Sequence, residues 1–184
     1  MKSVSLVALA IFFTLLSPMI VDAQKSLKSY SVEDEFSFQY PSNWKLHERE
    51  NRFSDTDAWL TYSNNGKDVL KIILQGYSNT TAQPDDEKLE ALESTVKNQE
   101  NGEIVESGVD NQMTNNRSAP YVIGTFTDRT LFGTPLNMVM LLSAVLLPNN
   151  ELIVVEYYAS ENDFDKYLPK VKGVINSISP ISPV

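Results

Sequence analysis

The chain has 184 residues, no Cys and one His, and its formal net charge is −9 at pH 7. Its length and its 42% hydrophobic content suit one globular domain with a core of its own. The lack of Cys excludes disulfides and zinc-thiolate sites, and the acidic balance without a Lys/Arg cluster disfavours nucleic acid and anionic membranes as partners.

Residues 1–23 predict a secretory signal peptide. Lys2 precedes a long apolar stretch that is interrupted at Pro18, and small residues lead up to Ala23. This pattern predicts cleavage between Ala23 and Gln24. An uncleaved anchor is the alternative, because the apolar stretch approaches the roughly 20 residues that span a bilayer. In both cases we expect the rest of the chain outside the cytoplasm, either secreted or on the outer face of the membrane.

The rest of the chain is expected to form one domain, residues 32–180, followed by a short tail, 181–184. Residues 24–31 are polar and show no periodicity, which predicts a flexible linker in front of the domain. No internal repeat divides the domain.

Four segments in the first half of the domain are predicted as strands: 36–40, 44–46, 59–62 and 68–77. In the first of them, aromatic residues alternate with polar ones, which predicts one buried face, and Pro41 ends the pattern. The last two flank Asn65-Gly66, the strongest short signal for a hairpin turn. Three residues of the last segment should face the core: Leu70, Ile72 and Leu74.

An amphipathic helix is predicted after Pro84, which suits a first helical position. Three carboxylates follow in the first turn, where the helix dipole favours negative charge. Leu89, Leu92 and Val96 recur at helical spacing, and Gly102 lies just beyond the expected end.

Residues 104–109, 121–127 and 136–147 are predicted as further strands, and the last of them enters the most apolar hairpin of the chain, Met138 to Ser160. Its two segments meet at Pro148-Asn149-Asn150, residues that suit a tight reversal. Both are apolar at nearly every position, which is typical of strands covered on both faces. We therefore expect helices on both sides of the sheet.

A second amphipathic helix is predicted near the C-terminus, with an apolar stripe from Phe164 to Ile178. Ser160 and Asp163 have the spacing of a capping box. Pro169 removes one helical hydrogen bond, so we expect either a kink or a main helix that begins at Pro169.

Candidate binding residues gather around one charged segment, 47–57. The residues that could form a partner or ligand surface are Trp44, His47, Phe53 and Trp59. The alternative for most of the aromatic ones is that they seal the core at the end of the sheet. The weak candidates for calcium ligands are Glu48, Glu50, Asp55 and Asp57. They lack the Gly-centred loop and closing Glu of a calcium motif.

No catalytic motif accompanies the single imidazole, and we therefore expect no enzyme and no cofactor. A surface position in the charged loop is the plain alternative for His47. Asn79 and Asn116 begin sequons for glycosylation, as would suit an exported domain.

The segment 36–46, with the sequence FSFQYPSNWKL, resembles the opening signature of PsbP-like domains. The closing half agrees, with FDKYLP at 164–169 and a helix that ends in Asn176-Ser177-Ile178. The resemblance covers nearly all of the chain after the signal peptide. It implies an α/β/α sandwich, in which a mainly antiparallel sheet of about six to seven strands carries helices on both faces.

The best-known members of this family are extrinsic proteins of photosystem II, which help retain calcium at the oxygen-evolving complex and catalyse nothing themselves. The resemblance therefore implies a non-enzymatic protein that docks on a protein partner or extrinsically on a membrane complex, with Ca²⁺ as an implied ligand. The second hypothesis is an extracytoplasmic module that binds a small ligand or calcium through the charged segment.

Overall fold

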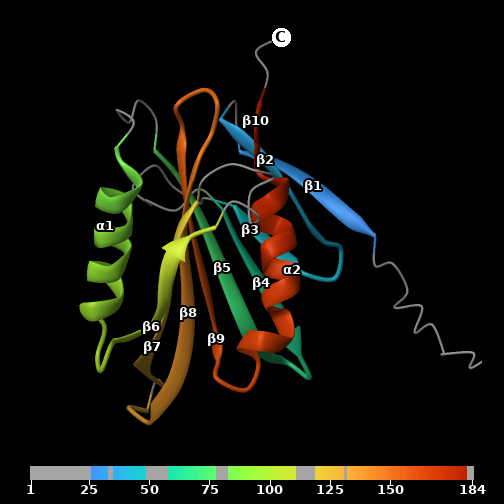
Figure 1. Cartoon of the computed structure of the whole chain (residues 1–184). Helices are drawn as coiled ribbons and strands as arrows, with labels where there is room; N and C mark the ends of the chain where they lie inside the picture. Colours follow the sequence, from blue (N-terminus) through green and yellow to red (C-terminus); the bar gives the residue numbers. More distant parts are fainter. Residues whose placement is uncertain are drawn as a thin grey trace, which may run out of the picture.

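The computed structural model describes residues 26–32, 35–48, 58–77, 83–110, 119–130 and 132–181. These residues form two antiparallel sheets and two helices (Figure 1). The elements are β1 (Leu27–Val32), β2 (Phe36–Pro41), β3 (Lys45–Glu48), β4 (Ala58–Asn64), β5 (Lys67–Tyr77), α1 (Asp85–Lys97), β6 (Glu103–Val109), β7 (Pro120–Arg129), β8 (Pro135–Leu146), β9 (Leu152–Ser160), α2 (Phe164–Ser177) and β10 (Ser179–Pro180).

The larger sheet has seven strands in the order β3-β4-β5-β9-β8-β7-β6, and every neighbouring pair is antiparallel. It confirms the predicted sheet of about six to seven mainly antiparallel strands. The predicted Asn-Gly turn is also confirmed, because Asn65 and Gly66 both have positive φ, 52° and 76°, between β4 and β5.

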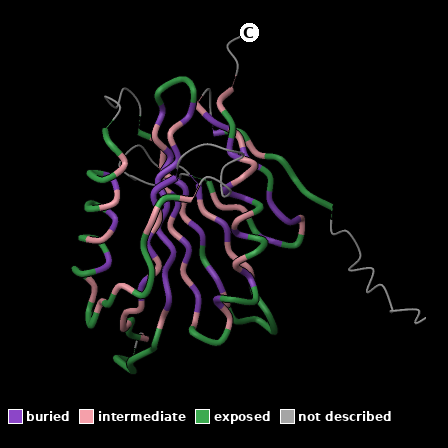
Figure 2. Tube along the Cα trace, in the orientation of Figure 1, coloured by how far each residue is buried: buried purple, intermediate pink, exposed green. Residues whose placement is uncertain are grey.

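The predicted apolar hairpin is confirmed as β8 and β9, which lie at the centre of the larger sheet. Alternate residues of β8 enter two different cores. Leu141 and Val145 pack with α2, whereas Met140 and Leu142 pack with α1. The burial along this strand is visible as the purple centre of the sheet in Figure 2.

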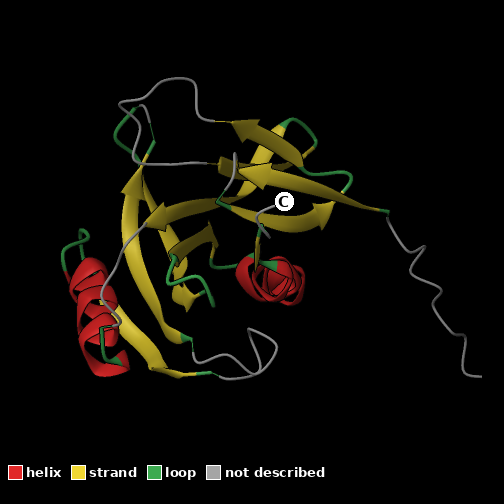
Figure 3. Ribbon diagram, turned by 90° about the horizontal axis from the view of Figure 1, so that it is seen from above, coloured by secondary structure: helices red, strands yellow, loops and turns green. Residues whose placement is uncertain are grey.

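α2 contacts β9 of the larger sheet and also β2 of the smaller, three-stranded sheet, β1-β2-β10 (Figure 3). The helix runs through Pro169 from Phe164 onwards, which rules out one of the two expected alternatives, a main helix that begins at Pro169. The predicted capping box does not form, because the Ser160 hydroxyl donates to the Asp163 carboxylate, 3.0 Å away.

α1 packs on β6, β7 and β8 through Leu92 and Val96, which are buried as predicted. Pro84 precedes the helix instead of opening it. Gly102 lies in the turn after α1, where the backbone passes close to the end of the helix. An added Cβ would lie 1.9 Å from the carbonyl oxygen of Val96, so only glycine fits. The left-handed residue of this turn is Asn101, with φ 54°.

The prediction of a flexible linker at 24–31 was wrong for residues 27–31, which the structure describes as part of a strand. Residues Leu27–Val32 form β1, which pairs with β2 from Leu27 opposite Pro41 to Val32 opposite Phe36. The strand is held by backbone hydrogen bonds while most of its side chains are exposed, so its sequence carries no hydrophobic period. Within the described ranges no helix is long and apolar enough to cross a membrane. The predicted signal peptide and its predicted cleavage site between Ala23 and Gln24 lie outside the described ranges.

Candidate functional site

The described residues cover one side of the larger sheet only in part. α1 packs over β6, β7 and β8, and on the same side the residues of β3, β4, β5 and β9 are half-buried or exposed. The strand register brings two rows of these residues together. We call this surface the open face, and it consists of Lys45, His47, Trp59, Thr61, Lys71, Ile73, Glu156 and Tyr158.

On β3 and β4 the open face carries two stacked rings. His47 lies opposite Trp59 on the neighbouring strand, and the rings are parallel to within 2° with centroids 5.0 Å apart. The His47 Nε2 atom lies 3.0 Å from the Thr61 hydroxyl, within hydrogen-bond distance. Backbone pairing and this contact fix the imidazole, which presents a flat, pre-organised aromatic surface.

A groove of about 440 Å³ continues the open face toward the lower end of the sheet. Its apolar floor includes an edge-to-face pair, Phe126 and Tyr158, with ring centroids 6.0 Å apart. The Tyr158 hydroxyl donates a hydrogen bond to the Glu156 carboxylate. The groove is lined by Thr61, Asp68, Val69, Leu70, Lys71, Ile73, Phe126, Asp128, Met138 and Tyr158.

Burial, together with the hydrogen bond to Glu156 and the charge of its carboxylate, raises the pKa of Tyr158 well above its ordinary value near 10. The phenol in the groove is therefore a neutral hydrogen-bond donor over the whole physiological pH range. Its apolar ring and polar tip suit a binding surface better than acid–base chemistry near pH 7.

The raised tyrosine pKa values predict a loss of stability at alkaline pH. The hydrogen bond to Glu106 raises the pKa of Tyr121 from 10 to about 12. A folded-state pKa above the unfolded value stabilises the fold fully below pH 10, and this contribution falls as the pH rises toward about 12. Urea unfolding between pH 9 and about 12 should show this fall, and Tyr121→Phe should reduce it. A pH-independent stability in this window would contradict the assignment.

The structure separates the predicted surface residues. His47 and Trp59 meet on the open face, but Trp44 is only 4% exposed and packs in the α2 core, as the alternative of a core position expected, so it is not part of the candidate binding surface. Its neighbour Lys45 occupies the open side instead, since side chains alternate along a strand.

The predicted calcium ligands are mostly outside the described residues. Glu48 is exposed at the end of β3. The other three calcium candidates, Glu50, Asp55 and Asp57, lie outside the described ranges. The surface candidate Phe53 and the two glycosylation sites, Asn79 and Asn116, also lie outside them. Among the residues that are described, no group of three or more His, Cys, Asp or Glu side chains could hold a metal ion.

The groove was not predicted from the sequence, because its walls come from five strands. Phe126 of β7, Met138 of β8 and Tyr158 of β9 meet only through the order of strands in the sheet. The sequence contained one usable signal. Each of these residues lies an even number of positions from the α1-facing residues of its own strand, and side chains at such positions point to the same face of the sheet.

No family model and no curated protein sequence matches the chain. CyanoP, LpqN and Mog1p are three of the solved structures that are similar to it. The cyanobacterial PsbP protein CyanoP of Synechocystis sp. PCC 6803 has a TM-score of 0.58 and 16% identity, covering 85% of this chain and 93% of its own.

The other two are similar to the same extent. LpqN of Mycobacterium tuberculosis, involved in cell envelope biogenesis, has a TM-score of 0.57 at 12% identity, covering 85% of this chain and 92% of its own. The Ran-binding protein Mog1p of Saccharomyces cerevisiae has a TM-score of 0.56 at 8% identity, covering 86% and 97%. At these identities the similarity shows a shared fold. It confirms the resemblance to PsbP-like domains that was predicted from the sequence.

Proposed function

Because the chain has a PsbP-like fold with a half-open sheet, we propose that it is an exported, non-enzymatic domain that binds a protein partner through the open face. The partner is a protein outside the cytoplasm or a complex on the outer face of the membrane. We take the fold as an α/β/α sandwich in which α1 covers only part of its side of the sheet.

The observation that carries the proposal is the continuity of aromatic and apolar side chains over the open face. Trp59 of the ring stack lies opposite Ile73 on β5, and Tyr158 lies diagonally across from Ile73 on β9, where Glu156 is its direct partner. The two stacked rings, Ile73 and Tyr158 are all half-buried. Aromatic residues are enriched at protein interfaces, and exposed contiguous apolar surface is typical of an interaction site. One similar structure, Mog1p, is named as a Ran-binding protein, which supports the use of this fold for protein binding.

Two further observations support a non-enzymatic role outside the cytoplasm. His47, the only imidazole of the chain, is held against Trp59 and Thr61 in a position that suits a contact residue. Residues 1–23 have the pattern of a secretory signal.

Ile73→Glu is expected to abolish the capture of the partner from the native envelope without unfolding the domain. The new carboxylate would be desolvated at the centre of the interface, which should weaken binding at least about tenfold. Val105→Glu is the matched control, because Val105 is 65% exposed on β6, the opposite edge strand of the sheet. Quantitative pull-downs with both variants test the proposal, and equal capture by Ile73→Glu and Val105→Glu would contradict it.

The groove volume favours one second candidate, a small-ligand module. About 440 Å³ lies within the range of about 300–1,000 Å³ that is typical of ligand pockets.

The calcium version of this candidate has a direct test. If partner binding is the function, millimolar Ca²⁺ should leave the melting temperature unchanged, since only binding to the folded state raises it. Thermal melting with and without Ca²⁺, with Mg²⁺ as a control for ionic strength, measures this. A rise with Ca²⁺ alone would favour the calcium-binding module.

A further inference from the structure

The β7–β8 hairpin ends in an exposed and largely apolar segment, residues 130 and 132–136, which we call the apolar tip. Phe132 of this tip is 96% exposed, and Leu136 is 43% exposed. Figure 1 shows that the hairpin extends beyond the other turns at its end of the sheet. Apolar side chains that gather on a protruding tip are typical of a surface that contacts a membrane or a protein partner.

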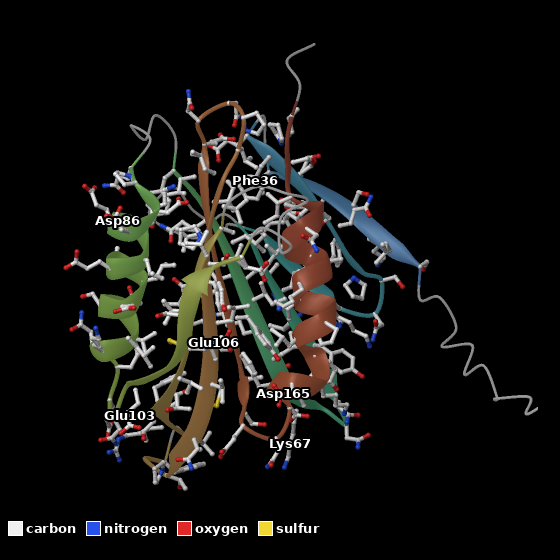
Figure 4. The ribbon with its side chains drawn as sticks, viewed as in Figure 1. Phe36, Lys67, Asp86, Glu103, Glu106 and Asp165 are labelled. Carbon is white, nitrogen blue, oxygen red and sulfur yellow. The ribbon has the colours of Figure 1, made fainter. Side chains whose placement is uncertain are left out.

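The residues of the apolar tip carry no charge, and the charged residues begin at the base of the hairpin with Asp128 and Arg129. Arg129 is paired with Glu100, because its Nε donates to that carboxylate at 2.9 Å. Figure 4 shows two further charged residues at this end of the sheet, Lys67 and Glu103, which belong to other strands. An uncharged apolar segment can enter the boundary between lipid head groups and acyl chains without the cost of desolvating a charge.

Hydrogen bonds within the hairpin pair the backbone of the apolar tip. The Gly133 amide donates to the Thr130 carbonyl at 2.8 Å, and the Thr130 amide donates to the Thr134 carbonyl at 2.9 Å. The Thr134 amide donates to the Thr130 hydroxyl at 3.0 Å, and Nη1 of Arg129 donates to the Gly133 carbonyl at 3.3 Å. Backbone groups that approach the hydrocarbon region need partners within the protein, because lipid tails offer none. This internal pairing suits the tip to a lipid environment.

We propose that the apolar tip inserts shallowly into a lipid bilayer of zwitterionic head groups, with Phe132 and Leu136 among the acyl chains. The net charge of −9 is repelled by anionic lipids, so a surface without net charge, such as phosphatidylcholine, suits the tip best. Leu136 lies two residues from Met138 on the same face of β8, and Met138 lines the groove of the open face. Insertion would therefore bring this end of the open face close to the membrane. The inference goes beyond the proposed function and does not depend on it.

Vesicle flotation tests the inference with the chain from Gln24 onwards, which lacks the apolar N-terminal segment and keeps every described residue. The wild type is expected to float with phosphatidylcholine vesicles, and less with vesicles that also contain phosphatidylglycerol. Phe132→Ser should lower the partition coefficient about tenfold, because it removes most of the apolar area that inserts. Phe132→Trp keeps an aromatic ring that suits the membrane interface, so it should bind as well as the wild type.

Leu27→Ser is the matched control, because Leu27 is 62% exposed on β1 of the smaller sheet. It should leave the flotation unchanged. A wild type that does not float, an equal loss in Phe132→Ser and Leu27→Ser, or stronger binding to the phosphatidylglycerol vesicles would overturn the inference. If the wild type does not float while Phe132→Ser loses the envelope partner, the tip is a protein contact and the inference is wrong.

Discussion

Replacing Tyr157 by alanine is expected to lower the free energy of unfolding by about 3–5 kcal/mol. The side chain has no exposed surface, and its ring stacks on Phe164 with centroids 4.9 Å apart. Its hydroxyl donates to the Phe164 carbonyl, 2.9 Å away, at the start of α2. The substitution would leave a cavity between β9 and α2 and remove the hydrogen bond that the hydroxyl donates to α2. Urea or guanidinium unfolding measures the change.

Tyr157→Phe is the matched control for this prediction. It keeps the ring and removes only the hydrogen bond, so it should cost about 1–2 kcal/mol. An equal loss in the two variants would mean that the hydroxyl and not the ring joins the helix to the sheet. A loss below about 1 kcal/mol for Tyr157→Ala would contradict the position of this residue in the core.

Gly102→Ala is expected to cost about 3 kcal/mol, because the added methyl group overlaps a backbone that has little room to move. It would lie 1.9 Å from the Val96 oxygen and 3.2 Å from the Gln99 oxygen. The turn that joins α1 to β6 would have to open, and the packing of Val96 on β7 would be lost with it.

Gly173→Ala on α2 should have the opposite sign. Nothing lies within 4 Å of an added Cβ there, so alanine should stabilise the helix by about 0.5–1 kcal/mol. Chemical unfolding of both variants tests the pair. If Gly102→Ala were as stable as the wild type, the close approach of the turn to α1 would be wrong.

The sequence predicted those parts of the fold that depend on local pattern. The hairpin of β8 and β9, the Asn65-Gly66 turn and the buried stripe of α1 were all visible in periodicity and turn residues. β1 was missed because an edge strand with exposed side chains is stabilised through its backbone.

The candidate site was predicted only in part, and for a physical reason. His47 and Trp59 are close in sequence and pair on adjacent strands, so both could be proposed as surface residues. Trp44 differs from them in strand parity and enters the core. The groove depends on β5 lying beside β9, a pairing of distant segments that no local pattern encodes.

Site-specific photo-cross-linking tests most directly whether the open face binds the partner. A benzophenone amino acid at Lys71, exposed on the open face, is compared in the native envelope with the same probe at Glu90, exposed on α1. Docking through the open face predicts one discrete cross-linked protein from position 71 and none from position 90. Cross-links from position 90 alone, or from neither position while the partner still co-purifies, would contradict it.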